Sequence, residues 1–412
     1  MRVLLISNGH GEDAVGAHLG RRLRELCPGW QLQALPLVGL GRSYERLGIA
    51  LLEPRRELPS GGVVRLNLRR FWSDLRQGWW ALRQGQLRTL GRLADQVHFA
   101  VVCGDIYALL TASHLRQPLY YVQTLVSEYY WRAKPWWEKL TQCERLFVDH
   151  FTPLERCVMR RRVALAFVRD QLSADYLRSC GLEMVRCHGN PLMDAFDATG
   201  WDLSPLVAGT CIALLPGSRS DAYWNLSLML QAAQLLAHSG LYTFMATLAD
   251  GFDLQQVQLP EDWRLYQPHP ALVTQGVAAI AACHPARVYL VSGRFGDILQ
   301  ACRLVIGTGG TANEQAAGLG KPVVGFWGPG PQYPRRFAIA QKRLLGEALQ
   351  LFPPDPGQVA QAVQRLLADG QLYVRAAQAG QERMAGRGRA LEQTAQEIVA
   401  HAERRLYSSR AS

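Results

Sequence analysis

The sequence lacks several features that mark common protein classes. Its nine cysteines include no Cys-x-x-Cys pair and several stand within apolar runs, so we expect reduced core cysteines rather than disulfides or a zinc site. No apolar run approaches the roughly twenty residues that a membrane-spanning helix needs. There is no Asp-x-Asp metal motif, no short-period repeat and no low-complexity tract. We therefore expect a globular protein with no metal site and no cofactor.

The first residues, MRVLLISNGHGED, do not have the pattern of a secretion signal, because their apolar run is too short and is followed at once by acidic residues. We expect a cytoplasmic protein, with any membrane association peripheral and on the inner face of the cytoplasmic membrane.

Length and charge indicate two domains and an anionic partner. A chain of 412 residues exceeds what one hydrophobic core usually serves. The net charge is +11, and residues 1–200 carry +8 of it, with 27 Lys and Arg against 19 Asp and Glu. The N-terminal half is therefore expected to meet lipid headgroups, nucleic acid or a phosphorylated substrate.

Strand-like apolar runs alternate with helix-like stretches, which predicts parallel sheets with crossover helices. The pattern breaks after Asp194, a new strand begins at Cys211, and the alternation resumes through Tyr242–Thr247, Trp263–Tyr266 and Val288–Val291. We expect an α/β protein of two doubly wound, Rossmann-like domains, with ligands in the cleft between them. The expected segments are a first domain at 1–195, a linker at 196–210, a second domain at 211–385 and a C-terminal helix at 386–412.

The segment from Leu304 to Val324, LVIGTGGTANEQAAGLGKPVV, has the pattern of a nucleotide cradle. Its glycines, Gly307, Gly309 and Gly310, permit a tight turn, and a helix that opens near Thr311 directs free N–H groups at an anion. Glu314, one turn into that helix, offers a carboxylate to sugar hydroxyls. An ordinary strand-turn-helix connection is the alternative.

A second turn of the same kind follows the strand at Cys211–Leu215. Gly217 and Ser218 supply backbone N–H groups and a hydroxyl, and Arg219 is a planar cation suited to a diphosphate. A surface arginine in a loop is the alternative. Two such turns in one α/β region favour a nucleoside diphosphate ligand.

Two residues of the first half are candidate bases. His10 lies in the turn after the first strand and is a residue type suited to general-base catalysis, and Asp105 follows a buried strand. A helix-capping role is the alternative for each. The first turn also matches Gly-x-Gly-x-x-Ala, but the next strand, QLQALPL, lacks the ribose-binding acid of dinucleotide enzymes.

The stretch from Arg65 to Arg92 combines seven arginines and one aspartate with apolar residues at helical spacing. Such a helix suits an anionic membrane surface. We expect membrane or acceptor contacts from Phe71, Trp72, Trp79 and Trp80. A core helix with a solvated basic side is the alternative. Nucleic acid is not expected, since no recognisable binding module accompanies the basic residues.

Taken together, these motifs resemble the GT-B glycosyltransferases, and most closely lipid-A-disaccharide synthase and related proteins. The likeness rests on LLPGSR at 214–219, HGNPLMD at 188–194, YVQ at 121–123 and GGTANE at 309–314. It implies inverting transfer of an acylated or N-acetylated glucosamine from a UDP donor to a membrane lipid, as in lipid A biosynthesis. It also implies that Ser218 and Arg219 contact the diphosphate and Glu314 the uridine ribose.

The sequence departs from that family at one catalytic position. The family carries a second aspartate three residues after the position that matches Asp105, and here that residue is Ala108. Two other functions are therefore open: a UDP-N-acetylglucosamine 2-epimerase, whose nucleotide segment is similar, and a non-catalytic sugar-nucleotide-binding membrane protein.

Overall fold

The computed structural model describes residues 1–56, 78–136, 150–196, 198–249, 251–330, 332–384 and 388–410. The chain forms two compact units. Unit 1 comprises residues 1–195 and 387–412, and unit 2 comprises residues 196–386. The last helix thus belongs to unit 1.

Unit 1 contains a seven-stranded parallel sheet in the order β3-β2-β1-β4-β5-β6-β7. Its central strands consist almost wholly of buried apolar residues, as expected when helices cover both faces. The strands are β1 (Arg2–Ser7), β2 (Gln31–Pro36), β3 (Ala50–Leu51), β4 (Phe99–Gly104), β5 (Leu119–Gln123), β6 (Val163–Val168) and β7 (Val185–Arg186).

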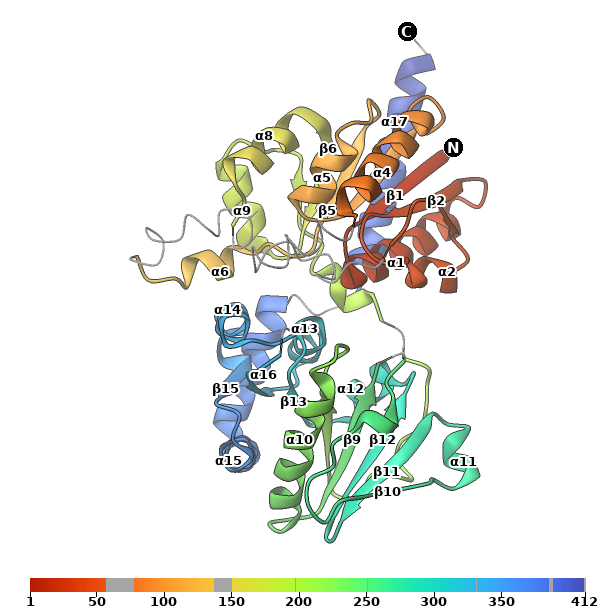
Figure 1. The fold of residues 1–412 in the computed structure, drawn as a ribbon. Coiled ribbons are helices and arrows are strands. Elements are labelled where there is room, and N and C mark those ends of the chain that lie inside the picture. The colour runs from red at the N-terminus through yellow and green to blue at the C-terminus, as the bar shows by residue number, and fades with distance from the viewer. Residues whose placement is uncertain are drawn as a thin grey trace. The chain divides into compact units, whose positions relative to one another are not determined.

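Helices cover both faces of this sheet (Figure 1). On one face α1 and α17 pack together, because α17 presents Leu391, Ala395, Ile398 and Ala402 at helical spacing. On the other face lie α4, α5, α8 and α9. The helices are α1 (His10–Leu26), α2 (Arg42–Arg46), α4 (Trp79–Leu93), α5 (Ile106–Ala112), α6 (Glu128–Arg132), α8 (Pro153–Arg162), α9 (Gln171–Ser179), η2 (Pro191–Asp194) and α17 (Ala390–Arg410).

Unit 2 contains an eight-stranded sheet in the order β10-β11-β12-β9-β8-β13-β14-β15. The five pairings from β12 to β15 are parallel, and the two that involve β11 are antiparallel. The strands are β8 (Thr210–Leu215), β9 (Tyr242–Leu248), β10 (Arg264–Tyr266), β11 (Val277–Cys283), β12 (Ala286–Ser292), β13 (Leu304–Gly307), β14 (Val323–Phe326) and β15 (Leu349–Phe352).

The expectation of uninterrupted alternation of strands and helices in this unit is wrong, because β11 pairs antiparallel with both β10 and β12. Only His284 and Pro285 separate β11 from β12, and so short a connection can join antiparallel strands only. The sequence pattern did not reveal β11 because this strand reads VAAIAAC, in which alanine predominates and the less buried face carries no polar residues.

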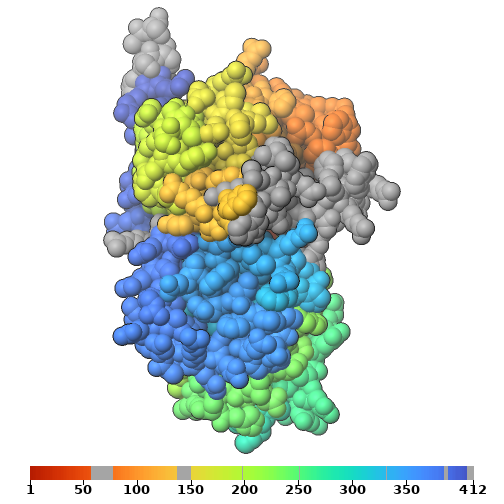
Figure 2. All heavy atoms as spheres, turned by 90° about the vertical axis from the view of Figure 1, so that its left-hand side faces the viewer, coloured from red at the N-terminus to blue at the C-terminus, as the bar shows by residue number. Residues whose placement is uncertain are grey.

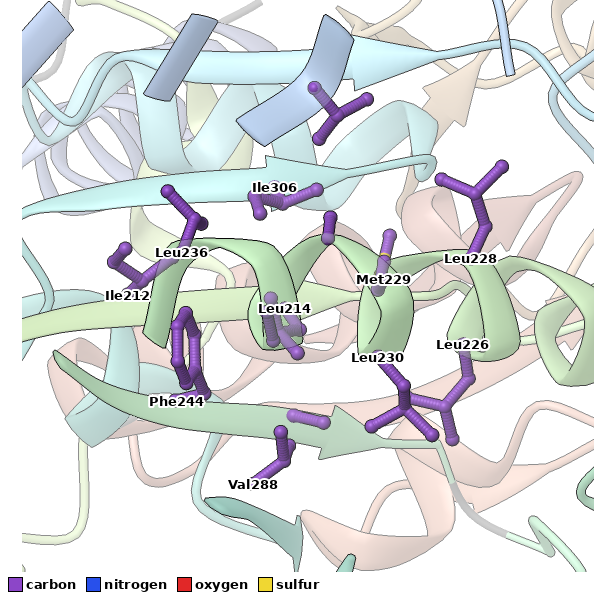
Figure 3. Close-up of a cluster of buried hydrophobic side chains, with 14 of the residues drawn as sticks. Ile212, Leu214, Leu226, Leu228, Met229, Leu230, Leu236, Phe244, Val288 and Ile306 are labelled. Carbon is purple, nitrogen blue, oxygen red and sulfur yellow. The ribbon is translucent and has the colours of Figure 1, made fainter. Parts of the chain in front are cut away.

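The core of unit 2 forms where α10 packs on the sheet. Leu226, Met229 and Leu230 of this helix meet Leu214 of β8 and Phe244 of β9 (Figure 3). Helices α14 to α16 form much of the face of unit 2 that Figure 2 shows. The helices are α10 (Ala222–Ala237), η3 (Leu254–Gln256), α11 (Pro270–Val273), α12 (Phe295–Ala301), α13 (Gly310–Gly318), α14 (Arg335–Leu345), η4 (Gly346–Ala348), α15 (Pro356–Ala368) and α16 (Gly370–Met384).

Each sheet has one point at which the strand order reverses. In unit 1 the chain proceeds from β1 to β2 on one side and from β4 to β5 on the other. In unit 2 the corresponding neighbours are β8 and β13. The carboxyl ends of the strands at such a point form the usual ligand site of a doubly wound sheet. None of the helices that the structure describes is long and apolar enough to cross a membrane.

Candidate nucleotide site and acceptor-side residues

The two glycine turns expected from the sequence lie side by side at the strand-order reversal of unit 2. Leu215 of β8 pairs with Gly307 of β13, so the chain leaves both strands at the same sheet edge. The Thr308 N–H donates to the Leu215 carbonyl over 3.0 Å, and the Thr308 hydroxyl donates to the Pro216 carbonyl, also over 3.0 Å. The hydrogen bonds of Thr308 therefore hold the two turns together.

The first turn directs two backbone N–H groups at one point. Gly217 has a φ of 106°, a conformation that favours glycine. The N–H groups of Ser218 and Arg219 then converge on a single acceptor, Oε1 of Gln332, over 3.0 and 2.8 Å. Successive N–H groups that share one acceptor form an anion-binding concavity.

The second turn uses its glycines for close packing rather than for a left-handed turn. A Cβ on Gly307 would lie 2.0 Å from Oδ1 of Asn313, and one on Gly310 would lie 3.0 Å from the Phe337 ring. Gly309 is extended, with a φ of −107°, and helix α13 begins at Gly310. Thr311 in the first turn of α13 is exposed, whereas Glu314 is 6% exposed.

The segment that follows β14 braces both turns, through Gln332 at the first turn and Gln341 at the second, and no sequence motif predicted these contacts. Gln341 accepts from the Tyr333 hydroxyl over 2.6 Å and from the Asn313 amide over 3.0 Å, and it donates to the Gly310 carbonyl over 2.6 Å. Burial raises the pKa of the Tyr333 hydroxyl, which therefore remains a donor at physiological pH. The nearest signal was the aromatic and amide content of WGPGPQY, which matches no known turn motif.

In unit 1, Asn8 and Asp105 lie at the carboxyl ends of β1 and β4, at the strand-order reversal. The Asn8 amide donates to Oδ1 of Asp105 over 2.6 Å. The same oxygen accepts from the N–H groups of Tyr107 over 2.8 Å and Ala108 over 3.3 Å, so Asp105 caps α5. Asp105 thus has the capping role that the sequence left as an alternative.

His10 is the first residue of α1, and its side chain is exposed. A Cβ on Gly39 would lie 3.6 Å from the ring of His10 and 3.8 Å from Oδ2 of Asp13, so both side chains face this glycine.

Asp13 is a buried carboxyl group that the sequence did not single out. It accepts from the Ser7 hydroxyl over 2.6 Å, and Ser7 in turn accepts from the Tyr44 hydroxyl over 2.9 Å. Burial raises the pKa of Asp13 from 3.8 to about 7, the hydrogen bond from Ser7 opposes that rise, and the nearby Glu12 adds to it. Near neutral pH this group can therefore hold or release a proton.

The aromatic residues assigned to the membrane have different surroundings. Helix α4 buries Leu82, Gln86 and Leu90, and the Trp79 ring packs on Tyr107 and beneath Arg83. Trp80 is 59% exposed. Phe71 and Trp72 lie outside the described residues. Within the described ranges there is also no cluster of three or more His, Cys, Asp or Glu residues that could hold a metal ion.

Comparisons with known proteins give structural likeness without sequence likeness. No protein-family model matches the chain, and no curated protein gives a significant match. Calicheamicin glycosyltransferase CalG4 superposes with a TM-score of 0.60 at 15% identity, over 98% of each chain. The fold is GT-B.

Two further solved structures are similar to this chain over nearly its whole length. The MnaA–UDP co-structure from S. aureus superposes with a TM-score of 0.59 at 15% identity, over 99% of this chain and 97% of that one. A putative UDP-N-acetylglucosamine 2-epimerase from Listeria monocytogenes gives 0.57 at 15% identity, over 97% and 95%. The expected GT-B fold class is thus confirmed, and the closer likeness to lipid-A-disaccharide synthase stays a prediction.

Proposed function

We propose that this protein is an inverting glycosyltransferase that moves a sugar from a UDP donor to a membrane lipid. The convergence of the Ser218 and Arg219 N–H groups on one hydrogen-bond acceptor supports the binding of a UDP donor. This position lies at the strand-order reversal of unit 2, where doubly wound sheets bind nucleotides.

In this proposal the donor's diphosphate binds at the point where the Ser218 and Arg219 N–H groups converge. The Arg219 guanidinium supplies a positive charge, and the N-terminus of α13, with Gly309, Gly310 and Thr311, directs further N–H groups at the same edge of the sheet. These groups are fixed before the reaction and would stabilise the negative charge that builds on departing UDP. Glu314 would accept hydrogen bonds from the uridine ribose.

We assign the general base to His10, with Asp105 as the alternative. His10 is exposed and would take the proton from the acceptor hydroxyl while that oxygen attacks the anomeric carbon. The bond to UDP breaks as the new glycosidic bond forms, and the anomeric configuration inverts. Oδ1 of Asp105 already accepts three hydrogen bonds, which hold this carboxylate in its capping position.

A lipid acceptor is supported by the charge and the exposed aromatics of unit 1. Most of the net positive charge lies in residues 1–200, and Trp80 and Trp136 are 59% and 69% exposed. Basic and aromatic side chains together favour an anionic bilayer surface. We therefore propose peripheral binding to the cytoplasmic face of the membrane, and a lipid-A-like glucosamine transfer as the specific reaction.

A UDP-N-acetylglucosamine 2-epimerase is the second candidate. The solved structures that resemble this chain include several such epimerases over nearly its whole length. The nucleotide site serves either reaction equally well, since both begin from a bound UDP-sugar. A non-catalytic sugar-nucleotide binder is the third possibility.

One experiment separates the three functions. The purified protein is incubated with a panel of UDP-sugars, with and without extracted membrane lipids, while UDP release and sugar isomers are followed. UDP release that depends on lipid is expected. Isomerisation without an acceptor would instead identify an epimerase, and binding without turnover a non-catalytic protein.

A further inference from the structure

The side chain of Gln332 occupies the anion position that the proposed function assigns to the diphosphate. Its Oε1 accepts from the N–H groups of Ser218 and Arg219, and its Nε2 donates to the Thr308 carbonyl over 3.3 Å. The carboxamide therefore spans both glycine turns. Its orientation is fixed chemically, because the reverse orientation would set an NH2 group against two N–H donors.

The backbone at Gly217 leaves room for the Gln332 side chain. A Cβ on Gly217 would lie 1.5 Å from Nε2 of Gln332, so the glycine at this position makes space for the carboxamide. The main chain of Gln332 is held separately, by donation of its N–H to Oδ2 of Asp221 over 2.8 Å. The side chain can thus leave the turns while the main chain stays in place.

We propose that Gln332 is a displaceable plug: its carboxamide fills the anion site, and a phosphate oxygen of the nucleotide must replace it. Neutral N–H to amide hydrogen bonds contribute little net free energy, whereas those to an anionic oxygen are about twice as strong. The exchange therefore favours the ligand. Gln332 then sets the affinity for diphosphates by competing with them.

This inference rests on the proposed function, and calorimetric titration of the full chain tests the two separately. Three probes are used: UDP, inorganic pyrophosphate and uridine. The Gln332→Ala variant removes the competitor. It should bind UDP and pyrophosphate about tenfold more tightly than the wild type, equivalent to about 1.4 kcal/mol, with uridine binding unchanged.

A second variant keeps the test decisive if the first one folds poorly. Gln332→Glu preserves the side-chain length and places a carboxylate against the same two N–H groups, where it forms stronger hydrogen bonds and repels phosphate. It should weaken UDP and pyrophosphate binding about tenfold or more. Gln255→Ala, at an exposed glutamine of unit 2, is the matched control and should change neither affinity. Thermal unfolding of each variant checks its fold.

The outcomes distinguish the plug from the nucleotide site. If the wild type binds UDP and Gln332→Ala binds it equally or more weakly, the plug is overturned and the proposed function stands. If pyrophosphate binding tightens in Gln332→Ala while UDP binds to neither protein, the plug is supported and the UDP-sugar function fails. Unchanged pyrophosphate binding in both variants would overturn the plug.

Discussion

The Asn8 amide donates to the Asp105 carboxylate across the ends of β1 and β4, with Nδ2 and Oδ1 2.6 Å apart. The same oxygen of Asp105 also accepts from two N–H groups of α5, so these contacts fix the carboxylate at the start of this helix in unit 1. His10, at the start of α1, is exposed. The capping contacts of Asp105 and the exposure of His10 are the reasons that we propose His10 as the base.

Replacement of His10 by alanine should lower turnover with lipid acceptor by about 10²- to 10⁴-fold, the usual contribution of a general base. Its thermal stability should stay close to that of the wild type, because the side chain is exposed. Asp105→Asn retains an oxygen that can cap α5, so turnover with the lipid acceptor should fall about tenfold or less. A large loss in Asp105→Asn with normal turnover in His10→Ala would assign the base to Asp105.

Substitutions of Arg219 and Glu314 should change the affinities for UDP and pyrophosphate in different ways. Arg219→Ala should weaken both UDP and pyrophosphate binding by about 10- to 100-fold, since a charge-assisted contact to phosphate is lost. Glu314→Gln should weaken UDP binding and leave pyrophosphate binding unchanged, because a ribose contact does not involve the phosphates. Calorimetry measures both, with Arg264→Ala, at an exposed arginine of β10, as the control. Equal effects of Glu314→Gln on the two ligands would contradict its ribose role.

The two loop glycines Gly217 and Gly309 should differ in their tolerance of alanine. Gly217→Ala combines a positive φ with a collision against Gln332 and should lower the free energy of unfolding by on the order of 1–3 kcal/mol. Gly309→Ala, where φ is −107° and the nearest atom to a new Cβ is 3.3 Å away, should cost less. Chemical denaturation compares the two. Addition of Gln332→Ala to Gly217→Ala should restore part of the loss, and no restoration would rule out the collision.

The sequence predicted the general architecture well because it depends on local patterns. Apolar strands separated by helices indicated two doubly wound units, and the glycine turns at Gly217 and Gly309 were placed correctly after strands. The residues that brace those turns could not be predicted, because Gln332 and Gln341 reach them through contacts distant in sequence. Asp13 was missed for a related reason: its raised pKa comes from burial, which only the folded chain creates.

The raised pKa of Asp13 predicts a pH dependence of stability. The folded state retains the proton up to about pH 7, whereas the unfolded state releases it near pH 3.8. The free energy of unfolding should therefore be highest at low pH in this window and fall between about pH 4 and 7, by on the order of 3 kcal/mol at most from this group. Asp13→Asn, which stays neutral, should remove that slope in denaturation curves.

An exposed acid supplies the control for Asp13. Glu261→Gln should leave the slope between pH 4 and 7 as in the wild type, since Glu261 is exposed. The same slope in Asp13→Asn as in the wild type would show that another group is responsible.

Membrane binding should depend on Trp80. This side chain is 59% exposed, and its transfer to the bilayer interface would bury a large ring. Trp80→Ser should lower binding to anionic phospholipid vesicles about tenfold in sedimentation assays. Tyr266→Ser removes an aromatic of similar exposure from unit 2 and should have no effect. Equal losses of vesicle binding in Trp80→Ser and Tyr266→Ser would contradict a membrane-binding surface on unit 1.

We propose above all that the N–H groups of Ser218 and Arg219 bind the donor's diphosphate. Nuclear magnetic resonance of ¹⁵N-labelled protein during titration with UDP tests it most directly, with uridine as the reference ligand. The amide signals of Ser218 and Arg219 should shift on addition of UDP and should not shift on addition of uridine. Saturable UDP binding that leaves both amide signals in place would contradict it.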